Sequence, residues 1–377
     1  MNRPAPSAAE RYAALAGALH KQRLPAALLC LERLEARAAQ LLREAGDLPL
    51  RLLSSSLRCL PMLRHLLDLD PRWQGLLCHD PREAIWLAAQ GLDDIVLSQP
   101  TLDPVQLRAI AHQATLGRRI SLAIDDPLQI DAAEDAAREL GCRLELMLDL
   151  HLGSPRAGQP QLSALREPTQ AVRLAKRIGA SNGLVHLRGV LAHRFAGDAQ
   201  RLQPGLAGLA QRKRLERQQS LGIRRREAFL AALHDVGFEP ELMLGALHPE
   251  SGAERARGLT QLCVGDALLR GSNDELPPLL LALPVLRCAG DAQRVCHGGG
   301  LPLQVQLPGG VSLLRSVADG PVLRLDTGTR PTLGEPVFFS SQDTLALLER
   351  SEQLLVVREQ QLVDRWPTYR GQQQLFL

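Results

Sequence analysis

Short apolar runs alternate with amphipathic stretches along most of this chain, and this alternation limits the possible folds most strongly. The runs at residues 50–54 and 94–98, for example, each precede a stretch with helical periodicity. Such stretches start at Pro81 and at Asp103 followed by Pro104, which suit a helix cap and first turn. Buried parallel strands joined by helices give this pattern. About eight such units predict an α/β fold, a (β/α)8 TIM-like barrel.

The pattern changes after about residue 276. Helical periodicity gives way to short β-like runs that are broken by glycine and proline, as at residues 301–307 and 311–317. We therefore expect three parts: an N-terminal arm at residues 1–23, a barrel at 24–275, and a smaller C-terminal β-domain at 276–377.

Composition argues against several classes of partner. The formal net charge is only +3, from 44 basic and 41 acidic residues, so no strong field points to nucleic acid or to a membrane surface. The basic run at residues 211–226 lacks aromatic residues for base stacking and is interpreted as a solvated helix face. No apolar run is long enough for a membrane span or a signal peptide. The seven cysteines form no CxxC pair, which predicts free thiols and a cytoplasmic location.

Several motifs resemble one known group of proteins. The run from Arg51 to Cys59, the segments Gly75–Cys78 and Glu83–Gly91, and the C-terminal run at residues 354–371 resemble the D-threonine aldolase and D-serine dehydratase group, especially its bacterial amino acid deaminase branch. These are fold-type III proteins with an alanine racemase N-terminal-like barrel. The resemblance implies a barrel followed by a β-domain, a pyridoxal phosphate (PLP) cofactor, and a dimer.

The group's Schiff-base lysine has no counterpart in this chain. In the matching run the position of that lysine holds Ser55, and a hydroxyl cannot form an imine. Lysine occurs at only three positions. Lys21 precedes the first apolar run, while Lys176 and Lys213 lie in helical stretches. No lysine is therefore expected at the end of a strand, and no cofactor is predicted.

The matching phosphate loops and metal positions are changed as well. The group's glycine-rich phosphate turn corresponds here to a segment that keeps Gly245, and its second phosphate loop corresponds to Gly265 and Asp266. A carboxylate at Asp266 would repel a phosphate dianion. Ser341 and Asp343 stand where the group has its metal ligands, so no metal is predicted.

Polar residues that follow the apolar runs form a residual pocket at the expected barrel mouth. His151 also follows such a run. The candidates are Ser54, Ser55, Ser56, Arg58, His79, Arg156, His193 and His297.

Three functions remain open from the sequence. The leading hypothesis is a pseudoenzyme that keeps the fold, lacks PLP catalysis and has a binding or regulatory role. It would act as a homodimer or as a heterodimer with an active paralogue, and it could hold a small-molecule ligand. The first alternative is a PLP-dependent lyase, deaminase or aldolase of D-amino or 3-hydroxy-amino acids. The second is a cofactor-free barrel enzyme that uses Ser55, Arg58, His79 and His193.

Overall fold

The described part of the chain forms two compact units. A computed structural model describes residues 7–153, 163–192, 206–247, 258–271, 276–298, 300–317, 320–326 and 328–376. The barrel unit comprises Leu42–Leu53, Pro71–Val264 and Phe376–Leu377, and the sheet unit comprises Met1–Leu41, Ser54–Asp70 and Gly265–Leu375. Each unit therefore draws on separate stretches of the sequence.

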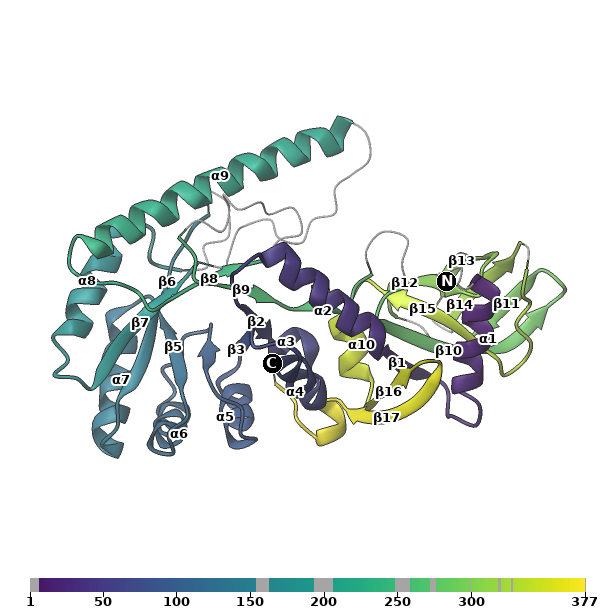
Figure 1. Cartoon of the computed structure of the whole chain (residues 1–377), viewed down its shortest axis with the longest axis horizontal. Helices are drawn as coiled ribbons and strands as arrows, with labels where there is room; N and C mark the ends of the chain where they lie inside the picture. Colours follow the sequence, from purple (N-terminus) through teal and green to yellow (C-terminus); the bar gives the residue numbers. More distant parts are fainter. Residues whose placement is uncertain are drawn as a thin grey trace. The chain divides into compact units, whose positions relative to one another are not determined.

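The barrel unit contains a closed barrel of parallel strands, so the predicted TIM-like barrel is confirmed (Figure 1). Neighbours in the barrel follow chain order, and the last strand pairs with the first. The strands are β2 (Leu50–Leu53), β3 (Trp73–Cys78), β4 (Ile95–Leu97), β5 (Ile120–Ile124), β6 (Leu144–Asp149), β7 (Val185–Leu191), β8 (Leu242–Ala246) and β9 (Gln261–Val264).

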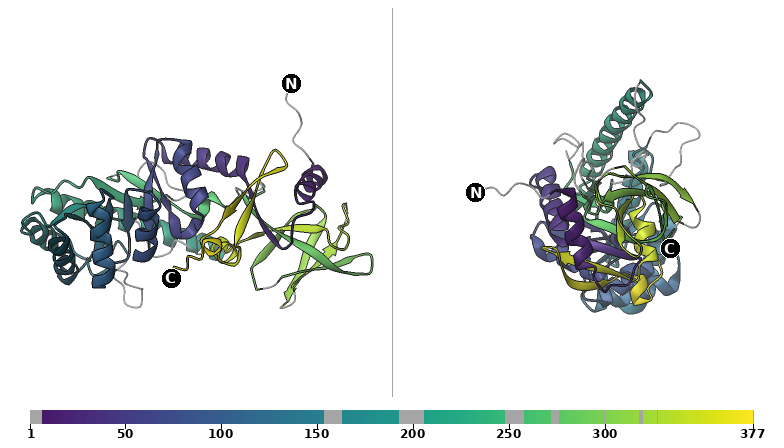
Figure 2. Two further views of the ribbon diagram at one scale, coloured as in Figure 1. Left: turned by 90° about the horizontal axis from the view of Figure 1, so that it is seen from below. Right: turned by 90° about the vertical axis from the view of Figure 1, so that its right-hand side faces the viewer.

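Helices of the barrel unit follow the strands. They are α5 (Pro81–Ala89), α6 (Pro104–Thr115), α7 (Pro127–Leu140), α8 (Pro168–Gly179) and α9 (Leu206–His234). The caps expected from the sequence are present. The Asp103 side chain accepts a hydrogen bond from the Val105 amide at 2.9 Å, and Gly141 ends α7 with a positive φ of 64°. Figure 2 shows α9 as one continuous rod, in teal.

The sheet unit is built on a mixed β-sheet with the strand order β13-β14-β11-β10-β1-β16-β17, and β15 pairs with both β10 and β12. Its strands are β1 (Ala26–Cys30), β10 (Leu279–Ala289), β11 (Gln293–Cys296), β12 (Leu303–Leu307), β13 (Val311–Val317), β14 (Gly320–Leu325), β15 (Pro336–Ser341), β16 (Gln353–Arg358) and β17 (Gln361–Pro367). Its helical segments are α1 (Ala8–Ala18), α3 (Ser54–Leu57), α4 (Leu60–Leu69), η1 (Asp266–Leu268), α10 (Thr344–Arg350) and η2 (Arg370–Gln372). Helix α2 (Leu31–Ala45) starts in the sheet unit and ends in the barrel unit.

The first apolar run lies outside the barrel, which differs from the expected barrel at residues 24–275. Strand β1 pairs with β10 in antiparallel and with β16 in parallel orientation. The barrel closes with β2 and β9 and ends at Val264. An apolar run of this length suits either a barrel strand or a central sheet strand, and the pairing partners decide between them. The β-domain also contains a helix, α10, that the loss of periodicity did not predict.

Each unit has its own hydrophobic core. Inside the barrel, Met147, Leu191 and Cys263 belong to a buried apolar cluster. In the sheet unit, Tyr12 and Leu15 of α1 pack with sheet residues such as Phe338. The N-terminal helix is thus part of the core that covers the sheet.

The sequence analysis predicted free thiols and no membrane span. All seven cysteines are free, and most are buried, although Cys288 is exposed and Cys142 is half-buried. Among the described residues, no helix has the length and apolar character to cross a membrane.

Candidate functional site at the barrel ends

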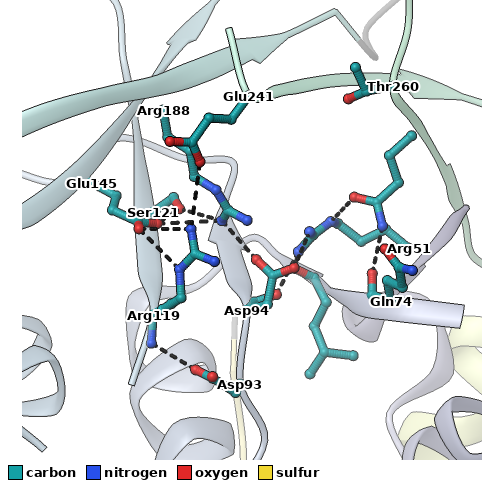
Figure 3. Close-up of polar contacts among 12 residues, drawn as sticks. Arg51, Gln74, Asp93, Asp94, Arg119, Ser121, Glu145, Arg188, Glu241 and Thr260 are labelled. Carbon is teal, nitrogen blue, oxygen red and sulfur yellow. Dashed lines mark hydrogen bonds and ion pairs between the residues drawn. The ribbon is translucent and has the colours of Figure 1, made fainter. Parts of the chain in front are cut away.

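A buried polar layer lies inside the amino end of the barrel (Figure 3). Arg51 is the second residue of β2, and Asp94 directly precedes β4. The Arg51 guanidinium contacts one Asp94 carboxylate oxygen at 2.7 Å, and Arg188 of β7 contacts the other at 2.7 Å. Both arginine side chains are buried. One carboxylate therefore joins two cationic groups from opposite parts of the barrel.

Neighbouring strands extend this layer. Arg188 also donates to the Ser121 hydroxyl at 2.9 Å and lies 3.4 Å from Glu145, and Ser121 donates to Glu145 at 2.8 Å. Gln261 of β9 accepts from Arg51 Nε at 2.8 Å. These partners offset much of the cost of burying the charges, although Arg188 Nε has no hydrogen-bond partner among the described residues. This network of buried ion pairs and hydrogen bonds is typical of a structural role.

Asp94 is held ionised in this layer. Its burial alone would raise the pKa of the carboxyl group, but the guanidinium groups of Arg51 and Arg188 outweigh burial, so the pKa lies below its ordinary value. The sequence analysis did not find this layer. The available signal was a charged residue inside apolar strand runs, as at Arg51 and Arg188.

At the carboxyl end, where barrels place their active sites, His79 forms the clearest polar contact. Its Nδ1 lies 2.5 Å from the Ser98 hydroxyl, which also lies 3.1 Å from the Cys78 carbonyl oxygen. Ser98 directly follows β4 and is 0% exposed. The buried Ser98 hydroxyl therefore orients the imidazole of His79.

Two further side chains lie at the same end of the barrel unit. Asp149, the last residue of β6, and His151 are both buried. Burial, followed by the charges of Arg225 and Arg166, lowers the pKa of His151. His151 is therefore neutral near pH 7.

The three serines form a helical turn. Ser54–Ser56 begin α3 directly after β2, with Ser54 buried and the other two half-buried. Arg58 then turns away with a positive φ of 41°. Its Nε donates to the Ser55 carbonyl oxygen at 3.1 Å, and its guanidinium pairs with Glu349 of α10 at 3.2 Å. The expected pocket residue Arg58 thus holds this turn against α10 within the sheet unit.

The remaining candidates do not form one site in the described residues. Arg156 and His193 lie outside them. His297 is an exposed residue of the sheet unit that follows β11, and its backbone N–H donates to the Pro284 carbonyl oxygen at 3.0 Å.

Residues 59–230 match the family described as alanine racemase, N-terminal domain. This region of the chain is similar to an alanine racemase N-terminal domain. This match covers the barrel strands β3 to β7 and does not include β2, β8 or β9.

Two curated proteins are similar to this chain over part of their length. One is D-threonine aldolase of Arthrobacter sp, which is 26% identical over 136 residues, or 36% of this chain and 35% of the relative. The other is 3-hydroxy-D-aspartate aldolase of Paracoccus denitrificans (strain Pd 1222), which is 23% identical over 119 residues, or 32% and 30%. The similarity thus spans about a third of each curated relative.

Solved structures share the fold over nearly the whole chain. D-threonine aldolase from Filomicrobium marinum has a TM-score of 0.75 at 20% identity, over 93% of this chain and 95% of that one. D-threo-3-hydroxyaspartate dehydratase from Delftia sp. HT23 has a TM-score of 0.74 at 15% identity, over 93% and 98%. At this identity the likeness establishes the fold alone.

The residues of this alanine racemase-like barrel do not fit a PLP group held by an imine. Ser55 stands at the strand end where the lysine is expected. All three lysines are exposed: Lys21 lies between α1 and β1, Lys176 lies on α8, and Lys213 lies on α9. A hydroxyl forms no imine, and these amines lie on the outer surface of their elements.

The expected phosphate positions serve other purposes. A Cβ atom at Gly245 would lie 2.2 Å from Leu259 Cδ1, so this glycine makes room for a packed leucine. Asp266 pairs with Arg270 at 2.5 Å.

The expected metal positions belong to a helix cap. Asp343 accepts from the Ala346 amide at 2.9 Å and begins α10. The Ser341 hydroxyl donates to the Asp343 carbonyl oxygen at 3.0 Å. In the part of the chain that the structure describes, no group of three His, Cys, Asp or Glu could hold a metal ion.

Proposed function

We propose that this chain is a non-catalytic member of the fold-type III PLP family and has a binding or regulatory role. The observation that carries the proposal is Ser55, the second residue of the helical turn that follows β2, where the resemblance implies the Schiff-base lysine. The capping role of Asp343 and the packing role of Gly245 agree with it. The fold remains while the groups for PLP chemistry are replaced.

The partner that best suits this role is a dimeric one. The resemblance implies a dimer, so we propose a homodimer or a heterodimer with an active paralogue. We also propose that the protein is located in the cytoplasm. Light scattering after size-exclusion chromatography should give twice the 41.2 kDa chain mass for the purified protein. A protein that is monomeric on its own and that does not co-purify with a co-expressed active relative would contradict this part of the proposal.

The decisive experiment treats the purified chain with PLP and then with borohydride. The proposal predicts no absorbance band near about 420 nm and no one-to-one reduced adduct at a single site in the intact mass, because no strand-end amine can form the imine. Peptide mapping controls for random labelling of the exposed Lys21, Lys176 and Lys213. A one-to-one adduct at a single lysine would refute the proposal and favour the alternative, a lyase, deaminase or aldolase like the named relatives.

A cofactor-free enzyme remains the other alternative. In this alternative, the residues expected to act in catalysis are Ser55, Arg58, His79 and His193. The ion pair of Arg58 with Glu349 and the burial of Ser98 beside His79 weigh against it. Its expected sign would be a turnover that is lost in His79→Ala.

A further inference from the structure

Three basic side chains lie on neighbouring stretches of backbone at the carboxyl end of β6. His151 follows β6 by two residues, and its backbone N–H donates to the Leu165 carbonyl oxygen at 2.9 Å. The carbonyl oxygen of the next residue, Arg166, accepts a hydrogen bond from the guanidinium of Arg225 on α9. All of these residues belong to the barrel unit. The group of His151, Arg166 and Arg225 is called the basic cluster below.

The basic cluster has no anionic partner among the described residues. His151 is 7% exposed, and its imidazole forms no hydrogen bond within the described part of the chain. Arg225 is half-buried, and its Nε is buried without a hydrogen-bond partner there. No described carboxylate forms an ion pair with Arg166 or Arg225. Cationic groups that are removed from water in this way are costly without a counter-charge.

Two carboxylates lie close in the chain, and both have interactions of their own. Asp125 accepts a hydrogen bond from the Ala164 amide at 2.8 Å and another from the Gln129 side chain at 3.0 Å. Asp149 is buried at the end of β6. The charges that act on His151 are instead those of Arg225 and Arg166, which together with burial lower the pKa of its imidazole.

The backbone beside the basic cluster offers no free amide to a phosphate. The amides of residues 164–167 all donate to side chains, and those of Arg166 and Glu167 both donate to the Gln170 side-chain oxygen, at 2.8 and 2.9 Å. Pro168, which begins α8, has no N–H. Phosphate sites at helix starts depend on such amides. A guanidinium group, in contrast, binds a carboxylate through its own N–H groups.

We propose that Arg166, Arg225 and His151 form a binding site for the carboxylate group of a small molecule. The two guanidinium groups supply the charge, and the imidazole supplies one further N–H donor. A bound carboxylate offsets the field of the arginines, so it raises the pKa of His151. The inference deepens the proposed binding role, on which it rests, by naming the charged group of the ligand.

Acetate is the test probe, with acetamide as the uncharged control and inorganic phosphate as the second anion. In proton–carbon NMR spectra of the full chain, acetate should shift a histidine ring signal saturably, and that signal should be absent from His151→Gln. Acetamide should cause no shift, and phosphate should bind at least about tenfold more weakly than acetate, because it lacks backbone donors. Acetate should bind more tightly at about pH 6 than at about pH 8, since binding favours the protonated imidazole.

Arginine variants test the origin of the affinity. Arg225→Gln should weaken acetate binding at least about tenfold, while Arg225→Lys keeps the charge and should retain part of the binding. Arg166→Gln changes an exposed side chain and leaves the backbone carbonyl in place, so it should fold normally and still weaken binding. Arg143→Gln is the matched control: it removes an exposed arginine at the opposite end of β6 and should bind acetate as the wild type does.

Three results would overturn the inference: no saturable acetate shift in the wild type, binding of acetamide or phosphate as tight as that of acetate, or unchanged acetate binding in Arg225→Gln or Arg166→Gln. None of these results depends on imine formation. The proposed loss of PLP chemistry fails separately, through a one-to-one borohydride-stable PLP adduct.

Discussion

At the scale of single residues, the most densely connected group is the polar layer at the amino end of the barrel. Asp94 is its centre, because both of its carboxylate oxygens contact a buried arginine. In TIM-type barrels this end contributes to stability and the opposite end to chemistry. The layer should therefore affect folding and leave ligand binding unchanged.

Replacing Asp94 by Asn should destabilise the chain by about 3 kcal/mol, because two buried guanidinium groups lose their anion. Denaturant unfolding measures this change. Asp135→Asn is the matched control: it breaks the exposed Asp135–Arg138 pair, which should cost less than about 1 kcal/mol. Equal effects of the two changes would mean that the layer has no special structural role.

The same carboxylate predicts an acid response. Because the folded pKa of Asp94 is lowered, its stabilising effect is complete above the unfolded pKa of about 4 and is lost as pH falls through the folded pKa. The unfolding free energy of the wild type should therefore fall more steeply below pH about 4 than that of Asp94→Asn. Parallel curves would show that Asp94 is not a major source of acid sensitivity.

Gly75 provides the space for Arg51 in this layer. Its φ is +67°, and a Cβ atom there would lie 2.4 Å both from Arg51 Nη1 and from the Asp94 carbonyl oxygen. Gly75→Ala should cost at least about 3 kcal/mol, through backbone strain and overpacking together. Gly46 has a φ of +66° with nothing within 4 Å, so thermal unfolding of Gly46→Ala should show the strain alone, about 1 kcal/mol. Similar losses in both variants would rule out the packing contribution.

At the scale of elements, α1 stabilises the sheet unit through apolar contact. Tyr12 packs edge-on against Phe338 of β15, with ring centroids 6.0 Å apart. Its hydroxyl is buried and has no hydrogen-bond partner among the described residues. Burial raises the pKa of this phenol, so the ring stays neutral. The ring, and not the hydroxyl, holds the helix on the sheet.

Tyr12→Phe should consequently be neutral or stabilising by up to about 1 kcal/mol, because an unsatisfied buried hydroxyl is removed. Tyr12→Ala should cost about 3 kcal/mol, since the ring contact is lost. Chemical denaturation of both variants compares the two groups directly. A clear loss in Tyr12→Phe would reveal a partner for the hydroxyl.

Sequence periodicity predicted the elements better than their partners. The barrel strands were predictable because several of the apolar runs are followed by a capped helix, as at Asp103. Strand β1 looks the same in sequence, yet its partners at residues 279–282 and 354–357 are far along the chain. Likewise, the partners in the polar layer are separated by 43 residues for Arg51 and Asp94. Local patterns do not encode such pairings.

The candidate site was predictable to a smaller degree. The motif around Ser55 located the serine turn, and the structure places it at the end of β2. The inward contact of Arg58 with Glu349 depends on a positive φ and on a distant helix, and neither is visible in a motif. The position of Arg58 in the motif was therefore the only basis for the prediction that it lies in a pocket.

At the scale of the whole molecule, two units share one chain in an interleaved way. The sheet unit takes residues from both ends of the sequence, while the longest stretch of the barrel unit, Pro71–Val264, is continuous.

Strand β1 also sets an order for folding during synthesis. Ala27 pairs with Leu354, so the ribosome must make almost the whole chain before β1 can find its parallel neighbour, whereas all barrel strands have been made by Val264. Non-local pairing of this kind is slow. Pulsed hydrogen exchange during refolding should protect β3–β8 amides before those of β1 and β16. The antiparallel partner of β1 is β10, which is made earlier, at residues 279–289, so β1 has no partner strand on either edge until about residue 280 has been made, and its apolar side chains need shielding during that time.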